Sequence, residues 1–298
     1  MYARPGDDIL ELARASGARA LFIVGTGKNT GKTVAMRAVY EAALARGTFP
    51  GLTSIGRDGE TIDIGDGGAK PRLFLRAGTY VATARDVLPR SPASEMVELS
   101  RLQTAAGTLA YVRVAHDAYY ELVGPPTASG IREAVGILAE RARCVIVDGA
   151  VDRIAALAGG ENAIVVACGA AASPTLEDAV ADVRGLVQKL RVPRYDGREP
   201  ALHIEGALTA SVAAKLMQSK ERRTIVVGDP TQIVLSGKGA SAALERLTIR
   251  CERTLDVVAI TVASIGRDRA FEPRTFAREV ASATGVPTFD VYAAERAA

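Results

Sequence analysis

Continuous apolar runs alternate along the chain with segments whose apolar residues recur at helical spacing. The apolar runs predict strands over 20–24, 51–55, 71–75, 109–114, 119–123, 144–148, 163–168, 202–205, 224–227, 256–262 and 288–291. The periodic segments predict helices over 8–16, 32–46, 79–88, 131–139, 174–187 and 273–285. Strands and helices that alternate on this scale predict an α/β fold built on a doubly wound, mostly parallel sheet.

Polar residues mark the expected helix starts. Asp7 or Asp8 is the expected cap of the first helix. Ser173 and Pro174 predict the start of the fifth helix, because serine caps free N–H groups and proline fits a first helical turn.

Two features of chain order bear on the architecture. The strands predicted at 109–114 and 119–123 are close enough in sequence to form an antiparallel pair. We expect residues 1–298 to form a single domain. The segment 194–200 is the candidate boundary if the chain subdivides, with 1–193 before it and an α/β extension at 201–298 after it.

Composition and charge narrow the function classes. Hydrophobic residues make up 48% of the 298 residues and charged residues 24%, as in ordinary globular domains. No apolar run has the length of a membrane span, and the first residues lack the apolar core of a signal peptide, so we expect a cytoplasmic protein without membrane contact. The formal charge of +3 is mild, and the basic cluster at 220–223 is typical of a solvated helix end, so no nucleic-acid partner is expected.

The residues between the first predicted strand and the second helix read Gly-Thr-Gly-Lys-Asn-Thr-Gly-Lys-Thr, from Gly25 to Thr33. In a strand, glycine-rich turn and helix of this kind, backbone amides point into one concavity and the helix dipole favours a polyphosphate there. Lys32 would reach the β- and γ-phosphates, and the Thr33 hydroxyl would bind Mg²⁺. The nucleotide-binding residues predicted are Gly25, Thr26, Gly27, Lys28, Asn29, Thr30, Gly31, Lys32 and Thr33, with ATP and Mg²⁺ as ligands. The alternative is a glycine-rich turn with an incidental Gly-Lys-Thr.

The spacing of this motif is one residue longer than the common G-x-x-x-x-G-K-[ST], because Thr26 stands where that pattern needs glycine. The resulting G-x5-G-K-T resembles the loop of dethiobiotin synthetase and related phosphate-loop ATPases, which implies a sheet of the phosphate-loop NTPase type. Lys28 resembles the extra lysine of dimerising ATPases, although it precedes Lys32 by four residues where that lysine precedes its counterpart by five. A homodimer is therefore one expectation for the assembly.

Three carboxylates are candidates for metal binding and catalysis. Asp148 ends an apolar strand, as a Walker B aspartate does, where it could hold Mg²⁺ directly or through water; the alternative is a turn at Asp148-Gly149. Asp58 and Glu60 follow the second predicted strand and could complete the Mg²⁺ shell or orient the attacking water, but Gly-Arg-Asp-Gly-Glu is also good turn chemistry. Arg57 and Arg153 could neutralise phosphate charge or form surface ion pairs.

The cysteines and histidines point to no other metal. Three widely spaced cysteines give no disulfide framework and no C-x-x-C pair, and two histidines are too few for a histidine-rich site. Mg²⁺ that arrives with the nucleotide is therefore the expected metal.

Three phrases resemble a more specific family: 53–60 (Thr-Ser-Ile-Gly-Arg-Asp-Gly-Glu), 78–84 (Gly-Thr-Tyr-Val-Ala-Thr-Ala) and 147–153 (Val-Asp-Gly-Ala-Val-Asp-Arg). Together with the glycine-rich loop they are similar to the ATPase subunit of lysine 5,6-aminomutase reactivase, over about the first half of the chain. The resemblance implies an ATPase that releases damaged cofactor from an adenosylcobalamin-dependent aminomutase, with a MutS-like second subunit as partner.

Two alternatives stay open. One is a dethiobiotin synthetase-like ligase. That family has a Lys-Pro segment where this chain has Ser54-Ile55-Gly56-Arg57, and a Glu-Gly-Ala-Gly-Gly segment where it has Asp148-Gly149-Ala150-Val151. The other is a nucleotide-gated scaffold, for which the binding loop alone would suffice.

Overall fold

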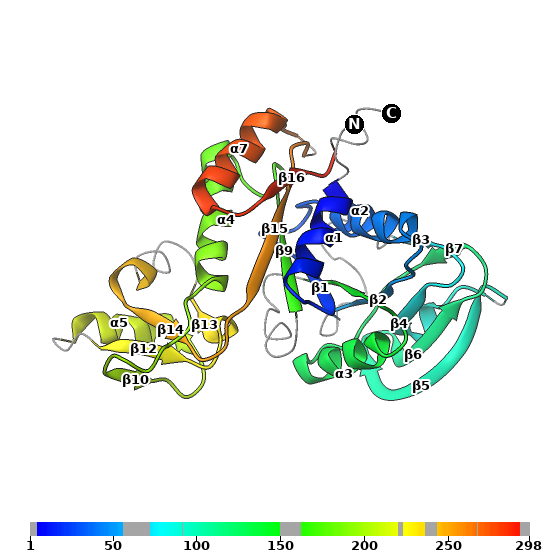
Figure 1. The fold of residues 1–298 in the computed structure, drawn as a ribbon, viewed down its shortest axis with the longest axis horizontal. Coiled ribbons are helices and arrows are strands. Elements are labelled where there is room, and N and C mark those ends of the chain that lie inside the picture. Colours follow the sequence, from blue (N-terminus) through cyan, green and yellow to red (C-terminus); the bar gives the residue numbers. More distant parts are fainter. Residues whose placement is uncertain are drawn as a thin grey trace.

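The computed structural model describes residues 5–55, 72–90, 92–149, 162–219, 223–235, 243–266 and 268–292. Figure 1 shows a large twisted sheet with helices on both faces and a smaller unit to one side. The strands of the large sheet are β1 (Ala20–Gly25), β2 (Gly51–Ser54), β4 (Tyr80–Ala84), β5 (Ser94–Thr104), β6 (Gly107–Val114), β8 (Val145–Asp148), β9 (Asn162–Gly169), β15 (Asp256–Ala263) and β16 (Thr288–Asp290). The helices that cover it are α1 (Pro5–Ala15), α2 (Lys32–Ala45), α3 (Ala128–Ala139), α4 (Leu176–Leu190) and α7 (Pro273–Thr284).

The order of strands across the large sheet is β16-β15-β9-β1-β8-β2-β4-β6-β5. All neighbours from β16 to β4 run parallel, and β6 is antiparallel to both β4 and β5. The expected α/β architecture with a mostly parallel sheet is therefore confirmed. After β1 the chain crosses to β2 on one side of the sheet, whereas β9, β15 and β16 lie on the other side. The reversal of strand order falls at β1, where α/β sheets place their ligands.

The strand β1 shows why the sheet is buried on both faces. Ala20, Phe22 and Val24 pack in a core with α3, α4 and α7, whereas Leu21 and Ile23 pack in a second core with α1 and α2. All six residues of β1 are buried. The continuous apolar run from 20 to 24 follows from this position, because a parallel strand covered on both faces has no solvent-facing side.

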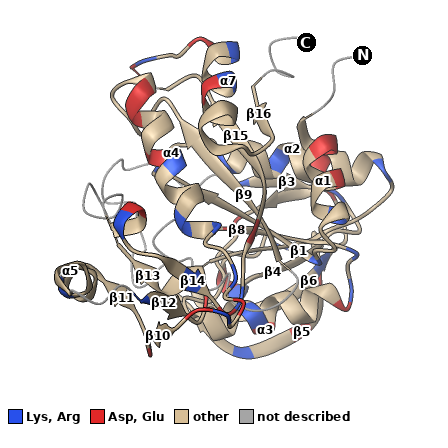
Figure 2. Cartoon of the chain, turned by 60° about the vertical axis from the view of Figure 1, so that its left-hand side comes forward, with Lys and Arg blue, Asp and Glu red and all other residues tan. Residues whose placement is uncertain are grey.

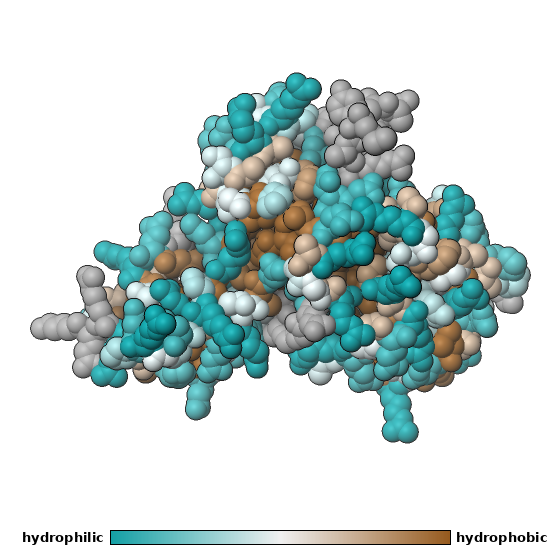
Figure 3. Space-filling model, in the orientation of Figure 1, coloured by the Kyte–Doolittle hydropathy of each residue, from teal (hydrophilic) through white to brown (hydrophobic). Residues whose placement is uncertain are grey.

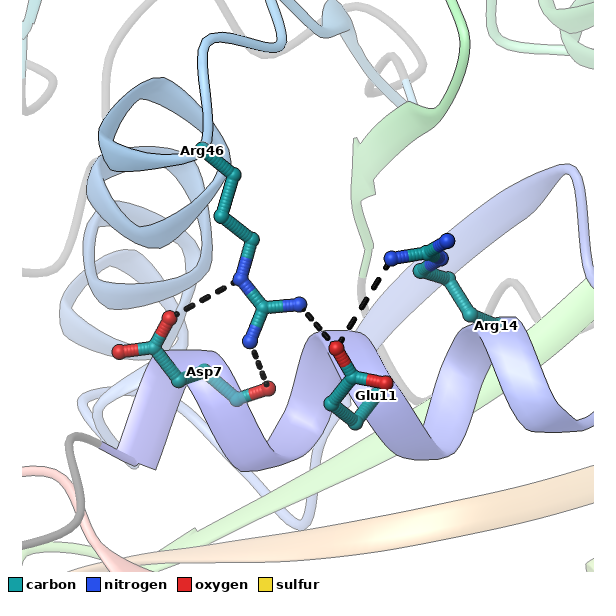
Figure 4. A network of polar contacts seen from close by, with 4 residues as sticks. All are labelled: Asp7, Glu11, Arg14 and Arg46. Carbon is teal, nitrogen blue, oxygen red and sulfur yellow. Dashed lines mark hydrogen bonds and ion pairs between the residues drawn. The ribbon is translucent and has the colours of Figure 1, made fainter.

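Helix α1 is tied to the end of α2 by a small polar network (Figure 4). The Arg46 guanidinium donates to Asp7 Oδ1 at 3.2 Å and to the Asp7 carbonyl at 3.4 Å, and it also contacts Glu11. Arg14 lies 3.8 Å from the same Glu11 carboxylate. Because Arg14 and Glu11 are mostly exposed and Arg46 and Asp7 are partly exposed, the network adds little stability beyond the apolar contact of the two helices.

The smaller unit contains β10 (Ala201–His203), β12 (Thr224–Val227) and β14 (Ile249–Cys251) in one parallel sheet, β11 (Leu208–Thr209) paired with β13 (Ile233–Val234), and α5 (Ala210–Gln218). It has a hydrophobic core of its own, formed by Val192, Leu208, Ala213, Ile225, Val227, Ile233, Leu235, Ala243, Ile249 and Cys251. The chain leaves the large sheet after α4 and returns to it at β15. A boundary near 194–200 therefore marks the departure only, because β15 and β16 belong to the large sheet rather than to a separate extension.

Two predictions about these elements are wrong. The segment predicted as a helix over 79–88 is the strand β4 followed by the short 3-10 helix Arg85–Val87. Four of the five residues at 79–83 are β-branched or aromatic. Val81, Ala82 and Thr83 are fully buried in the sheet, so tertiary contact overrides the helical spacing. The strand β7 (Ala118–Tyr120) pairs antiparallel with β3 (Leu73–Leu75) and not with β6.

The start of α4 also differs from its prediction. Thr175 is the N-cap, and its Oγ1 accepts a hydrogen bond from Asp178 N at 3.1 Å, whereas the Ser173 hydroxyl donates to Asp182. Asp7 and Asp8 lie in the first turn of α1, which begins at Pro5.

Replacing Thr175 by alanine is expected to lower the free energy of unfolding by about 1 kcal/mol, because the Asp178 amide would lose its acceptor. Urea unfolding followed by circular dichroism measures this change. The matched control is Ser282→Ala on the exposed face of α7, where alanine favours the helix. Equal losses in the two variants would refute the cap.

The surface shows no simple charge pattern. In Figure 2 acidic and basic residues lie side by side along α4 and α7. Figure 3 shows a mostly hydrophilic surface with hydrophobic residues visible in the centre, where β15 and β9 lie in Figure 1.

Candidate functional site

The candidate site is the turn between β1 and α2, at the carboxyl edge of the large sheet. β1 ends at Gly25 and α2 begins at Lys32, so the predicted order of strand, turn and helix is confirmed. Asn29 and Gly31 have left-handed backbones, with φ of 57° and 86°. Gly31 is the N-cap of α2, and no side chain caps this helix. By contrast, side-chain oxygens of Thr127, Thr175, Thr209 and Glu272 cap α3, α4, α5 and α7.

The Lys32 side chain folds back over the turn. Its Nζ donates to the Gly27 carbonyl at 2.7 Å, and the Thr30 hydroxyl donates to the same carbonyl at 3.2 Å. The turn is also anchored to the neighbouring strand, because Thr26 N donates to Ala167 O at 2.9 Å. These contacts hold a positive charge directly above the glycine-rich turn.

Two glycines of the turn cannot be replaced without displacing neighbours. A Cβ at Gly25 would lie 2.4 Å from Thr30 Oγ1 and 2.9 Å from Lys32 Nζ. A Cβ at Gly31 would lie 2.8 Å from the Ala263 Cβ, and its positive φ disfavours other residues. The turn therefore depends on the absence of side chains at these positions.

Asp148 lies at the end of β8, the strand next to β1. It is in register with Ile23 of β1 and Ser54 of β2, so it stands at the carboxyl ends of three adjacent strands. Ile23 packs in the core under α1 and α2, and strand partners in register face the same side. The Asp148 side chain is therefore on the face of the sheet where α2 begins. Gly149 N donates to Ile23 O at 3.0 Å and fixes the chain after Asp148.

The remaining predicted residues divide into two groups. Thr33 is the second residue of α2 and is partly exposed, and Lys28 and Asn29 are exposed at the tip of the turn. Asp58, Glu60, Arg57 and Arg153 lie outside the described residues. The structure thus places Asp148 at the end of the strand next to β1, and the roles of all three carboxylates stay predictions.

A second wall of the site was missed at the level of sequence. Gly169 at the end of β9 lies against the turn, since a Cβ there would be 3.0 Å from the Thr30 Cα. Ala172 approaches Gly27, and Ala263 at the end of β15 approaches Gly31. The run Gly-Ala-Ala-Ala at 169–172, directly after a predicted strand, was the available signal: such small residues allow another backbone to come close.

The hairpin after β15 supports this wall. Ile265 and Ala270 form an antiparallel bridge, and Arg269 Nη1 donates to the Ser173 carbonyl at 3.0 Å. Ser264 is fully buried and donates to Asp290 at 3.4 Å. These contacts join the loops after β9, β15 and β16 beside the turn.

The described part of the chain contains neither a cluster of metal-ligating side chains nor a reactive thiol. No group of three or more His, Cys, Asp or Glu side chains within it could hold a metal ion. The three cysteines are free, and burial raises the pKa of Cys168 to about 12 and that of Cys144 to about 11. These thiols therefore stay protonated at neutral pH and are poor nucleophiles.

No helix among the described residues has the length and apolar character needed to cross a membrane. Comparison with protein-family models, with curated proteins and with solved structures found no match to the chain. The residues around the β1–α2 turn are therefore the basis for assigning a function.

Proposed function

We propose that the chain binds ATP with Mg²⁺ at the turn between β1 and α2 and hydrolyses it, as a phosphate-loop NTPase does. The observation that carries the proposal is the glycine-capped start of α2, with the Lys32 ammonium lying over the turn. The N-terminus of a helix attracts phosphate through its dipole and its first-turn amides, and no side chain caps α2. The position at the reversal of strand order supports the same site.

Each residue has a role that follows from its position. The backbone amides from Gly25 to Thr33 would surround the phosphates, and Lys32 would exchange its hydrogen bond with Gly27 for phosphate oxygens. Thr33 and Asp148 would hold the Mg²⁺ that accompanies the nucleotide. Asp58 and Glu60 stay candidates for orienting water. Positive charge fixed at the phosphates stabilises the transition state more than the ground state, which is how this site would accelerate hydrolysis.

The finer proposal is that hydrolysis serves a protein partner. It rests on the resemblance of three phrases to the ATPase subunit of lysine 5,6-aminomutase reactivase, so the proposed partner is an adenosylcobalamin-dependent aminomutase together with a MutS-like subunit. In the structure, the phrase 78–84 forms the turn into β4 and the strand itself. Ser54 and Ile55 of the first phrase lie beside Asp148 of the third, because Ile55 N donates to Asp148 O at 2.7 Å.

Phosphate release from ATP and Mg²⁺, measured with and without candidate partners, tests this function. We expect slow basal turnover that rises when an aminomutase or its MutS-like subunit is added. A ligase would instead consume ATP only with a diamine or carboxylate substrate, and a scaffold would bind ATP without turnover. Calorimetric titration that shows no binding of ATP and Mg²⁺ at millimolar concentration would reject all three.

A further inference from the structure

A cavity of about 600 Å³ lies away from the β1–α2 turn, between α2 and β3, which are side by side in Figure 1. Its apolar lining includes Tyr40, Leu44, Phe49, Leu52, Phe74 and Leu75. The volume falls within the usual range of small-molecule sites. Nothing in the proposed ATPase chemistry uses this cavity.

Exposed aromatic rings mark the cavity as a binding surface. Phe49 is 44% exposed and Phe74 is 43% exposed, although both are large hydrophobic side chains. Phe74 is held in place by Tyr119, with ring centroids 5.1 Å apart, and by the Arg76 guanidinium, which lies 5.2 Å from the Phe74 centroid. Ordered rings that remain open to solvent offer a ligand apolar contact at little cost in side-chain entropy.

The walls are fixed relative to one another by Tyr40. Its hydroxyl, on α2, lies 2.8 Å from Thr79 Oγ1 and accepts a hydrogen bond from Arg76 N at 2.8 Å. Helix α2 is therefore joined to the segment after β3 by one buried and one partly buried polar contact, and the cavity between α2 and β3 is preformed.

Two ion pairs stand at the rim. Arg76 Nη1 donates to Asp117 Oδ2 at 2.6 Å, and Asp117 Oδ1 accepts from Ala77 N at 2.8 Å. The hydrogen bond from the Ala77 backbone, followed by that from Arg76, lowers the pKa of the Asp117 carboxyl and keeps it ionised. Arg37 and Glu41 are 3.9 Å apart on neighbouring turns of α2. Within the described residues Arg76 uses one guanidinium nitrogen, so its other N–H groups can receive a carboxylate.

The sign of the rim selects the ligand. The positive charges of Arg37 and Arg76 balance the negative charges of Glu41 and Asp117, so the rim has no net charge. A ligand with a net charge of either sign therefore meets as much repulsion as attraction. A head group that carries both charges meets an opposite charge for each. We propose that this cavity binds an α-amino acid with a large apolar side chain, its carboxylate at Arg76, its ammonium at Glu41 and its side chain against Phe49 and Phe74.

L-Tryptophan is a direct probe, because the chain contains no tryptophan and the ligand's fluorescence can be observed alone. Titrating the full chain without nucleotide should raise the fluorescence anisotropy of L-tryptophan to saturation, and L-leucine should reverse the change. Tryptamine lacks the carboxylate and indole-3-propionate lacks the ammonium, so each should bind about tenfold more weakly. Equal binding of either analogue would show that one charge suffices and would overturn the proposal.

Matched variants locate the site. Arg76→Gln and Glu41→Gln should each weaken L-tryptophan about tenfold, and Arg76→Gln should leave the binding of tryptamine unchanged. The control is Arg113→Gln on β6, which breaks a similarly exposed ion pair with Glu95 on β5. Thermal unfolding confirms that each variant is folded. The proposal fails if neither L-tryptophan nor L-leucine binds, or if the Arg76 and Arg113 variants bind alike. ATP titration of the same variants keeps this result separate from the proposed ATPase.

Discussion

Lys32→Ala is expected to lower the rate of ATP hydrolysis by about a hundredfold to a thousandfold. The ammonium of Lys32 is held over the β1–α2 turn by its 2.7 Å hydrogen bond to the Gly27 carbonyl, where it would neutralise charge on the transferring phosphate. Phosphate release at saturating ATP and Mg²⁺ measures the effect on turnover. The fold should persist, because Lys32 is partly exposed and packs in neither of the two cores of the large sheet.

The control for this variant is Lys215→Ala. Lys215 is exposed on α5, in the smaller unit. Its replacement by alanine removes the same charge as Lys32→Ala, but far from the turn. Its hydrolysis rate should match that of the unmodified chain. Turnover that survives in Lys32→Ala, with circular dichroism showing native structure, would remove the turn from the proposed active site.

Phe22→Ala is expected to lower the free energy of unfolding by about 3–5 kcal/mol. Phe22 is 1% exposed at the centre of β1, and its ring packs in the core formed with α3 and α4. Removing the ring leaves a void between the sheet and those helices, because β1 is paired on both sides and cannot move to fill it. Urea unfolding gives the difference in free energy.

Phe49→Ala makes the same change at a ring that is 44% exposed. It should cost less than Phe22→Ala, since nearly half of the Phe49 surface is already in contact with water and less packing is lost. Similar losses at the two positions would mean that β1 is not the centre of the sheet.

The strands of the large sheet were the most predictable part of the fold. The apolar runs that predict strands at 20–24, 163–168 and 256–262 correspond to β1, β9 and β15, which adjoin one another inside the sheet. A strand buried on both faces must be apolar throughout, so its own sequence carries the signal. The strand β5 gave no such signal: it lies at the edge, and most of its residues are exposed.

The helix predicted over 79–88 failed for a related reason. Tyr80 to Ala84 are held by pairing with β2 and with β6, partners about 30 residues away on either side in sequence. Local spacing cannot report such pairing. The same limit applies to β3 and β7, whose partnership depends on two segments that meet only in the folded chain.

The candidate site also contains residues that local sequence predicts and residues that it does not. The turn from Gly25 to Thr33 is continuous in sequence, and its glycines and Lys32 announce both the backbone geometry and the charge. Asp148 was predicted because it ends an apolar strand, and the sheet order places that strand next to β1. The wall made by Gly169, Ala172 and Ala263 was not predicted, because alanine and glycine carry no chemistry that marks them.

Local residue patterns are enough to predict the alternation of strands and helices and the chemistry of one turn, because both depend on residues that are close together in the chain. The strand order that brings β8 and β9 to either side of β1, the return of β15 from the smaller unit, and the cavity between α2 and β3 are visible in the folded chain alone. These features depend on contacts between distant segments. Such contacts are selected by how the apolar faces fit together, which no local pattern of residues records.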